Sequence, residues 1–528
     1  MDYQLNVGAI LRRGEELFAH KTISSRLPDK SWHTYTYADF ARRSKQLSLA
    51  LRNELGLGDG DRVATFAWNH HEHLEAYIGA PVGGFVTHTL NLRLHPDDLT
   101  YIATHAGDRV LIADKTLWPL VEAFKDRVGF EHVIAIGAGD TPPGAIDFEE
   151  LLATADADAF TYRDIDERAA AAMCYTSGTT GKPKGVVYSH RAIVIHSLAS
   201  TQSSSLGISE TDSVLPVVPM FHANAWGFPF TCTLVGSRQV FPGPHLDPVS
   251  LLDAFVEEEV TVTAGVPTIW MGILQALDAE PGRWDLSRLR SMIVGGAAAP
   301  KAMIEGFEKR HGLRITHAWG MTEMAPMGTI SSLSSRELAL SEDEQYTYRA
   351  KQGLPSPLGE IRARGGEGLV PWDGATMGEL EVRGPWISSS YYNAPEANDR
   401  WTDDGWFKTG DIVTIEPNGY VEIQDRSKDL VKSGGEWIST VALENALMGH
   451  PAVLEAAVIA VPDDKWSERP LAVVVFREGQ SADADELRAF LAPHFAKWWL
   501  PERFEVVDEI PKTAVGKFRK TALRERFT

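Results

Sequence analysis

The chain has 528 residues, a formal net charge of −21 at pH 7, 44% hydrophobic residues and 23% charged residues. A chain of this length exceeds one ordinary hydrophobic core, so we expect at least two domains. The acidic balance argues against nucleic acid as a bulk partner, and the lack of a run of about 18 apolar residues argues against stable membrane insertion. The two cysteines, Cys174 and Cys232, lie in apolar runs, which predicts reduced core residues of a cytoplasmic protein.

Short apolar runs alternate with longer helical patterns as far as Gly359. Helices are expected at 36–55 and 251–259, and strands at 62–68, 109–113, 132–136, 213–218, 260–266, 291–295 and 314–318. This alternation predicts α/β layers of mostly parallel sheets in a large N-terminal domain.

A histidine cluster, His70, His71 and His73, follows one of these strands. Three histidines suggest a metal site, but the H-E-x-x-H spacing of zinc-binding helices is absent. The preferred interpretation is the start of a helix, with Asn69 as its N-cap.

The string YTSGTTGKPKG at 175–185 concentrates glycines, hydroxyls and lysines between apolar runs at 170–175 and 185–188. Glycines let backbone N–H groups approach a polyanion, hydroxyls donate to its oxygens, and lysines supply positive charge. We therefore predict a phosphate-binding loop between two strands, and not a Walker A loop, whose spacing is absent. A helix is expected next, with Ser189 as N-cap and Ile193, Ile195 and Leu198 on its apolar face. A polar surface turn is the alternative.

Beyond Gly359 the pattern changes. Alternating strands at 379–383 and 420–424 lie among Gly, Pro and Asn turns and predict a small β-rich subdomain. After the charged stretch 425–429 we expect a helix at 440–448, strands at 454–461 and 471–476, a helix at 484–491 and a strand at 504–507. The predicted division is therefore an N-terminal domain at 1–424, a hinge at 425–430 and a small α+β domain at 431–528.

The end of the chain is basic although the chain as a whole is acidic. The cations are Lys512, Lys517, Arg519, Lys520, Arg524 and Arg526. A solvated tail is one interpretation, and a site for a polyphosphate ligand is the preferred one.

Further strings follow the 175–185 loop in order: HAWGMTE at 317–323, TGD at 409–411, DRSKD at 425–429, KSGGEWIS at 432–439 and PKTAVGK at 511–517. Together they resemble the adenylate-forming superfamily of acyl-CoA synthetases, peptide-synthetase adenylation domains and beetle luciferases. The strings SGGEWIS, VPMFHANAW at 218–226 and ENALMGHP at 444–451 look most like bacterial medium- and long-chain fatty acyl-CoA synthetases.

The resemblance implies an ATP-dependent acyl-CoA ligase that uses Mg²⁺ and CoA, with the C-terminal domain as a mobile lid and a homodimer as one assembly. The ATP and AMP site would comprise Thr176, Ser177, Gly178, Thr179, Thr180, Gly181, Lys184, Gly296, Ala297, Trp319, Gly320, Asp411 and Arg426. Asp411 would accept hydrogen bonds from the ribose hydroxyls, and Trp319 would lie beside adenine.

The resemblance also assigns catalytic roles. Glu323 would bind Mg²⁺, which prefers a carboxylate with phosphate oxygens and water. Thr322 would donate to the α-phosphate, and Lys517 would bridge the carboxylate and the α-phosphate while charge shifts between them. His222 would border the acyl carboxylate. Taken as single residues, each is more often a surface, capping or half-buried group.

The acyl group would lie against Trp226, Ala223 and Gly227, and CoA would pass Gly434, Gly435, Glu436 and Trp437 after the lid rotates about Lys428. Relatives that activate amino acids carry an Asp where this chain has Ala223, so an amino-acid substrate is disfavoured. A medium- or long-chain fatty acid is the preferred substrate. The alternatives are a short thioether acid such as methylthiopropionate, an aryl acid, a non-catalytic acyl-adenylate binder and a luciferase-like oxygenase.

Overall fold

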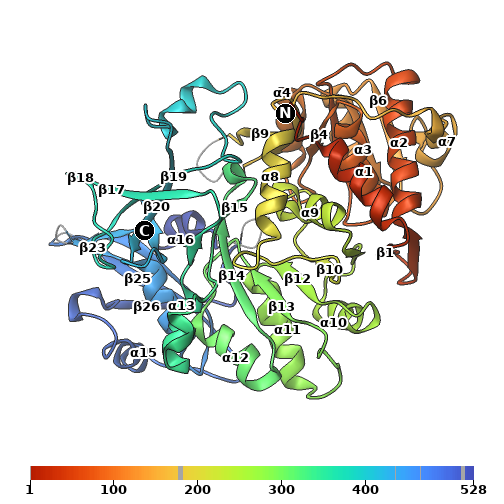
Figure 1. Cartoon of the computed structure of the whole chain (residues 1–528). Coiled ribbons are helices and arrows are strands. Elements are labelled where there is room, and N and C mark those ends of the chain that lie inside the picture. Colours follow the sequence, from red (N-terminus) through yellow and green to blue (C-terminus); the bar gives the residue numbers. More distant parts are fainter. Residues whose placement is uncertain (1, 177–181, 434–435, 464, 513–517) are drawn as a thin grey trace.

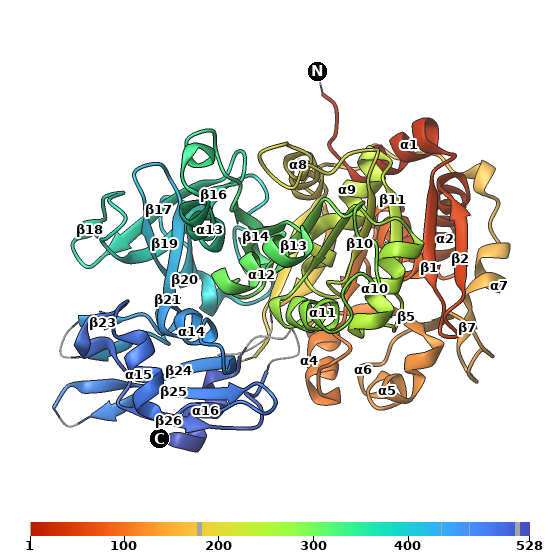
Figure 2. The ribbon, with the colours of Figure 1, turned by 90° about the horizontal axis from the view of Figure 1, so that it is seen from below.

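The computed structural model describes residues 2–176, 182–433, 436–463, 465–512 and 518–528. Figures 1 and 2 show a large N-terminal part made of sheets and covering helices, with the C-terminal domain against one side of it. The termini lie far apart (Figure 1).

Two large sheets form the N-terminal part. The first has the order β7 (Ile146–Asp147), β6 (His132–Ile136), β5 (Asp108–Asp114), β3 (Arg62–Phe66), β4 (Val86–Thr89), β8 (Ala170–Tyr175), β9 (Gly185–Ser189). The second has the order β16 (Leu354–Pro355), β15 (Met327–Ile330), β14 (Ile315–Gly320), β13 (Ser291–Val294), β12 (Val262–Gly265), β10 (Ser213–Pro216), β11 (Arg238–Phe241), β1 (Thr22–Arg26), β2 (Trp32–Thr36). Strands pair in parallel through the middle of each sheet and antiparallel only towards its edges.

Helices cover these sheets. They are α1 (Val7–Phe18), α2 (Tyr37–Asn53), α3 (His71–Val82), α4 (Pro96–Ala106), α5 (Trp118–Glu122), α6 (Lys125–Val128), α7 (Phe148–Ala153), α8 (His190–Ser200), α9 (Phe228–Val235), α10 (Pro248–Glu257), α11 (Pro267–Ala279), α12 (Lys301–His311) and α13 (Glu342–Ala350). One core cluster takes side chains from both sheets and from α1, α2, α3, α8 and α9, so these helices share a core with both sheets. A second cluster lies between the nine-stranded sheet and α10 to α13.

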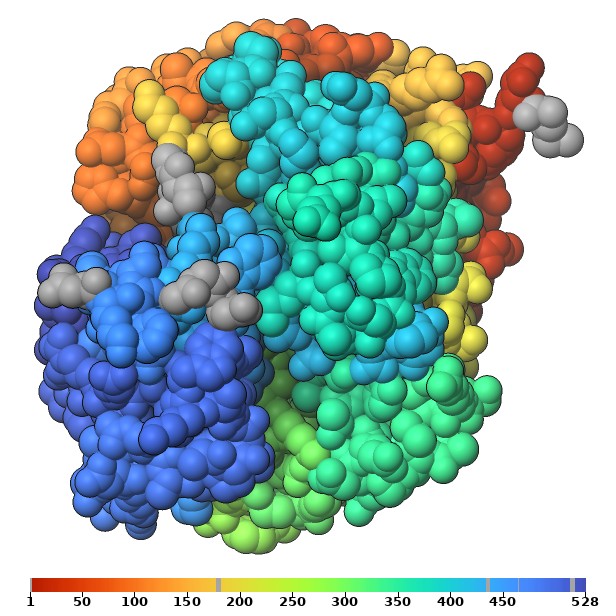
Figure 3. All heavy atoms as spheres, turned by 90° about the vertical axis from the view of Figure 1, so that its left-hand side faces the viewer, coloured from red at the N-terminus to blue at the C-terminus, as the bar shows by residue number. Residues whose placement is uncertain are grey.

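A five-stranded antiparallel sheet follows, with the order β18 (Gly368–Leu369), β17 (Glu360–Gly365), β19 (Gly378–Arg383), β20 (Phe407–Ile415), β21 (Val421–Arg426). The C-terminal domain contains β22 (Val431–Ser433), β23 (Glu436–Ile438), β24 (Val453–Asp463), β25 (Ser467–Phe476), β26 (Arg503–Val506), α14 (Thr440–Met448), α15 (Ala484–Leu491) and α16 (Lys520–Phe527). In the space-filling view this blue domain sits beside cyan and green parts of the N-terminal domain (Figure 3).

The predicted fold class is confirmed: layered, mostly parallel sheets with a β-rich subdomain and a separate α+β C-terminal domain. Strand β21 runs to Arg426, so the first two residues of the predicted hinge at 425–430 continue a strand of the N-terminal domain. Among the residues that the structure describes, no helix combines the length and the apolar character needed to cross a bilayer.

Two local predictions are wrong. Asn69 does not cap α3, because its acceptor Oδ1 is taken by the Met220 N–H, while its amide nitrogen donates to the Pro216 and Val218 carbonyls. His70 is the cap, and its Nδ1 accepts from the His73 N–H. Leu198 of α8 is 47% exposed, because polar residues of that helix, His196 and Ser197 among them, occupy the buried side.

Candidate active site

The predicted phosphate loop starts and ends at hydrogen-bonded residues. The Thr176 N–H donates to the Lys184 carbonyl over 3.0 Å, and the Lys184 N–H donates to Thr176 Oγ1 over 3.1 Å. Strands β8 and β9 flank the loop, and Ser189 caps α8 through the Ala192 N–H, both as predicted. The predicted ligands Ser177, Gly178, Thr179, Thr180 and Gly181 lie outside the described residues.

Glu323 is a buried carboxylate that forms no ion pair with any described lysine or arginine. It lies in the short 3₁₀ turn η4 (Thr322–Met324) after β14 and is 5% exposed. Its Oε1 accepts a hydrogen bond of 2.6 Å from the Tyr391 hydroxyl. Burial, and after it the Glu323 carboxylate, raise the pKa of Tyr391, so the phenol stays a donor. A buried anion with one neutral donor is a suitable ligand for a divalent cation.

Backbone contacts at Gly320 and Thr322 fix the position of the turn that carries Glu323. The Thr322 carbonyl accepts from the Tyr188 hydroxyl, which ties the turn to β9 beside the phosphate loop. A Cβ at Gly320 would lie 1.8 Å from the Pro326 carbonyl oxygen, so only glycine fits at the end of β14.

Asp411, on β20 of the β-rich subdomain, contacts two other residues of the predicted nucleotide site, Trp319 and Arg426. One of its oxygens accepts from Trp319 Nε1 at 3.1 Å, and the other lies 2.7 Å from Arg426 Nε. Asp411 and Arg426 face each other across β20 and β21. Because Trp319 is only 9% exposed, little of its surface is open to a nucleotide.

A pocket of about 230 Å³ lies between the two domains. Ala297, which follows β13 and Gly296, lines its N-terminal side together with Met271 of α11. Phe518 lines its C-terminal side. Lys517 itself is outside the described residues, but its neighbour Phe518 lines the same pocket as Ala297, a residue of the predicted nucleotide site.

The predicted acyl-binding residues form a left-handed turn, η3 (Ala223–Gly227), directly after His222. The φ angles are +43° at Ala223, +53° at Asn224, +50° at Ala225, +54° at Trp226 and +79° at Gly227. Each non-glycine residue in this conformation costs roughly 1–2 kcal/mol, and such strain concentrates at functional sites.

Neighbouring side chains hold the turn in place. The Cys174 thiol donates to Asn224 Oδ1 over 2.8 Å. A Cβ at Gly227 would lie 2.6 Å from Cε1 of His196, so the ring packs directly on the backbone. His222 is half-buried, and its backbone N–H donates to the Pro219 carbonyl.

The predicted CoA-binding string lies on the far side of the C-terminal sheet. Strand β23, which carries Trp437, is at one edge, and β24, whose Leu454 lines the interdomain pocket, is at the other. The two strands are three strand spacings apart, about 14 Å. Gly434 and Gly435 lie outside the described residues, as does the Glu436 side chain. Lys428 is exposed in the turn between β21 and β22.

Three cations of the C-terminal basic cluster are paired with carboxylates of this chain. Lys520 lies 2.7 Å from Glu444, Arg524 pairs with Asp429 at 2.5 Å, and Lys512 pairs with Glu455 at 2.7 Å. These three side chains therefore have anionic partners already, while Lys517, on which the preferred interpretation rests, lies outside the described residues.

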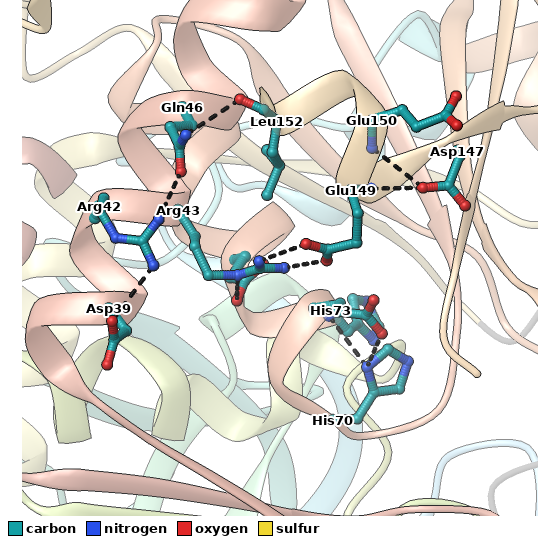
Figure 4. A network of polar contacts seen from close by, with 12 residues as sticks. Asp39, Arg42, Arg43, Gln46, His70, His73, Asp147, Glu149, Glu150 and Leu152 are labelled. Carbon is teal, nitrogen blue, oxygen red and sulfur yellow. Dashed lines mark hydrogen bonds and ion pairs between the residues drawn. The ribbon is translucent and has the colours of Figure 1, made fainter. Parts of the chain in front are cut away.

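The histidine cluster belongs to a polar network that joins helices. Donor atoms of His70, His71 and Glu72 lie within 4.8 Å of one another, but His70 also pairs with Asp114 at 3.2 Å. Near it, Arg43 of α2 binds Glu149 of α7 through both terminal nitrogens (Figure 4). We interpret the network as structural, because it ties α2, α3 and α7 together.

Comparison with known proteins places the chain in a family. The profile of the AMP-binding enzyme family matches residues 15–392, and that of the AMP-binding enzyme C-terminal domain matches residues 442–517. The chain belongs to the AMP-binding enzyme family.

Relatives of this AMP-binding enzyme are CoA ligases. It is 49% identical to a long-chain-fatty-acid–CoA ligase of Thermus thermophilus over 100% of this chain and 96% of that one. It is 45% identical to a 3-methylmercaptopropionyl-CoA ligase of Ruegeria pomeroyi over 93% and 91% of the two chains. The structure of the anthranilate CoA ligase AuaEII with anthranoyl-AMP aligns with a TM-score of 0.88 at 25% identity, over 100% of this chain and 98% of that one. The predicted enzyme class, an AMP-forming acid–CoA ligase that uses ATP, Mg²⁺ and CoA, is confirmed.

One residue beside the candidate Mg²⁺ ligand of this AMP-binding enzyme was not predicted from the sequence. Tyr391 contacts Glu323 from 68 residues further along the chain. The tyrosines at 391 and 392 are visible in the sequence, but no local pattern connects them to Glu323.

Proposed function

We propose that this ligase activates a medium- or long-chain fatty acid through an acyl-AMP intermediate. The observation that carries the proposal is the left-handed turn 223–227. It sets the Trp226 indole against Gly295, next to Gly296 and Ala297 of the predicted nucleotide site. The turn itself carries no acidic side chain that could pair with a substrate ammonium group. Ala223 directly after His222 leaves that place small and uncharged.

In the first step a carboxylate oxygen of the acid attacks the α-phosphorus of ATP, and the bond to the β-phosphate oxygen breaks. The products are acyl-AMP and pyrophosphate. Both reactants are anions, so the protein must neutralise charge and align them. We assign Lys517 to the bridging position, Thr322 to the α-phosphate, and Asp411 with Arg426 to the ribose. The position of Phe518 in the interdomain pocket supports the assignment of Lys517.

Glu323 would hold Mg²⁺, together with phosphate oxygens. Its burial and its lack of a cationic partner among the described residues support this role. When bound, the ion neutralises phosphate charge. The residues of this chain orient the phosphates: Thr176 and Lys184 close the loop, and Tyr391 directs one oxygen of Glu323.

In the second step the CoA thiolate attacks the acyl carbonyl, the carbon–oxygen bond to AMP breaks, and acyl-CoA forms. We assign Gly434, Gly435, Glu436 and Trp437 to the CoA passage. Since β22 and β25 lie between β23 and the strand that borders the pocket, this step requires the lid to rotate, and we assign the pivot to Lys428.

A pyrophosphate-release assay with a panel of acids tests the substrate. Octanoate, palmitate, 3-methylthiopropionate and benzoate cover the fatty, thioether and aryl classes. We expect kcat/KM to be highest for a fatty acid. A preference for 3-methylthiopropionate or benzoate would replace the proposal with one of the alternatives, and no turnover with any acid would favour a non-catalytic binder.

The homodimer and the cytoplasmic location belong to the same proposal. Buried free Cys174 and Cys232 are consistent with a reducing compartment. Light scattering at micromolar concentration tests the assembly, and a mass of one chain would exclude the dimer.

A further inference from the structure

We propose that Tyr391 is a positioning residue that couples the Mg²⁺ ligand Glu323 to the phosphate-loop lysine Lys184. The inference rests on the proposed function, because it assigns Glu323 to Mg²⁺ and Lys184 to the phosphates. It adds a residue from a separate part of the chain, the segment between β19 and β20.

One tyrosine side chain touches both groups. Its hydroxyl donates to Glu323 Oε1 over 2.6 Å, and its ring centroid lies 5.1 Å from Lys184 Nζ, within cation–π range. Tyr391 is 7% exposed, so both contacts are shielded from water. The hydroxyl occupies Oε1, which leaves Oε2 of Glu323 for a ligand.

The backbone around Tyr391 is held at the same two places by other bonds. The Ser388 N–H donates to the Glu323 carbonyl over 2.8 Å, and the Tyr392 N–H donates to the Gly185 carbonyl over 2.9 Å. The Tyr391 ring also packs edge-on against Trp401, with centroids 5.1 Å apart. Because these contacts do not involve the hydroxyl, a variant that lacks only the hydroxyl should keep the fold.

A hydrogen bond to a carboxylate ligand orients it and tunes its affinity for the metal. Without the hydroxyl, Oε1 of Glu323 would remain buried and unpaired, and the carboxylate would be free to rotate. We expect weaker Mg²⁺ binding in the adenylation step and no change in a step that needs neither ATP nor Mg²⁺.

The test is Tyr391→Phe, with Tyr392→Phe as the matched control, because the Tyr392 ring packs against His105 instead. Pyrophosphate release is measured with the best acid of the panel over a range of Mg²⁺ concentrations. For Tyr391→Phe, the Mg²⁺ concentration at half-maximal rate should rise about tenfold or more, with the rate recovering at saturating Mg²⁺. Thioester formation from synthetic acyl-AMP and CoA should be unchanged, and Tyr392→Phe should behave like the wild type.

Unchanged Mg²⁺ dependence in Tyr391→Phe, or equal loss in both half-reactions, would overturn the inference. A wild type inactive with every acid would instead refute the proposed function. If Tyr391→Phe melts well below the wild type, two further variants are compared: Glu323→Gln alone, and Glu323→Gln combined with Tyr391→Phe. The affinity of each for MgATP is measured by calorimetry. Equal MgATP affinity in the two supports action through Glu323, and an additive loss contradicts it.

Discussion

The six-membered ring of Trp226 lies directly on the backbone of Gly295. A Cβ added to Gly295 would be 3.0 Å from Cη2 of this indole and 3.1 Å from the Ala318 carbonyl oxygen. Gly295 directly follows β13 and precedes Gly296 and Ala297 of the predicted nucleotide site, while Trp226 belongs to the turn assigned to the acyl group. The two proposed half-sites therefore share one contact surface, and a change on either side should be felt on the other.

Gly295→Ala should disturb acid binding. The added methyl would displace the indole, and overpacking of this kind costs about 1–3 kcal/mol of stability. We expect the KM for the fatty acid to rise more than the KM for ATP. Gly366→Ala is the control, since a Cβ there meets no atom within 4 Å. An unchanged acid KM would mean that the indole is not part of the acyl site.

Trp226→Ala should change the ranking of acids by chain length more than it changes the KM for ATP. The indole is a large apolar wall, and its removal opens the space beside Ala223 and Gly227. Trp372→Ala, at a 43% exposed tryptophan of the β-rich subdomain, controls for the loss of an indole as such. Melting temperatures must accompany the kinetics because packing is lost too. If the folded variant keeps its acid preference, the fatty-acid proposal is weakened.

Lys517→Ala should abolish most acyl-adenylate formation while largely sparing thioester formation from supplied acyl-AMP. A cation placed on charge that develops only in the first step is worth about a hundredfold in rate or more. Lys497→Ala, at an exposed lysine of the C-terminal domain, is the control. Separate assays of the two half-reactions give the answer, and equal losses in both would refute this role.

Lys428→Pro should impair thioester formation and spare adenylation, which is the reverse of the effect expected for Lys517→Ala. The Lys428 N–H donates no hydrogen bond within the described residues, so proline removes none there and acts by restricting φ. We expect adenylation to persist and thioester formation to fall about tenfold or more as rotation of the lid is hindered. Lys428→Ala should be near normal. Normal overall turnover in the proline variant would place the hinge elsewhere.

Acid should destabilise the N-terminal domain through its buried histidines. His196 is 2% exposed, and burial lowers its pKa to about 4. Between about pH 6.5 and pH 4 the unfolded chain binds a proton that the folded chain does not, so stability falls as the pH falls. From pH 7 to pH 5 this one group contributes about 2 kcal/mol of that loss.

His196→Gln should therefore lose less melting temperature between pH 7 and pH 5 than the wild type does. The exposed His494 provides the control variant His494→Gln, which should keep the wild-type dependence. Identical pH dependence in all three proteins would show that His196 is not one of the titrating groups.

Sequence strings identified the chemistry because they are local. The phosphate loop, the acidic residue after a strand and the hinge signal are each carried by a short run of consecutive residues. The local backbone geometry follows directly from such a run. The strands flanking 175–185, the Ser189 cap and the helices at 440–448 and 484–491 were predicted on this basis and were found. The Asn69 cap prediction failed because the Met220 N–H, 151 residues away in sequence, donates to the side-chain oxygen that would have capped the helix.

By itself, therefore, the sequence determined the α/β class, the family and the candidate residues of the ATP site. Only the tertiary structure decided which of them share a surface: Tyr391 with Glu323 and Lys184, Trp226 with Gly295, and Phe518 with Ala297. It also paired Lys520 with Glu444 and Arg524 with Asp429 of the predicted hinge. The physical reason is that hydrogen bonds, ion pairs and close packing form between groups brought together by chain folding, and their separation along the chain leaves no periodic or local trace.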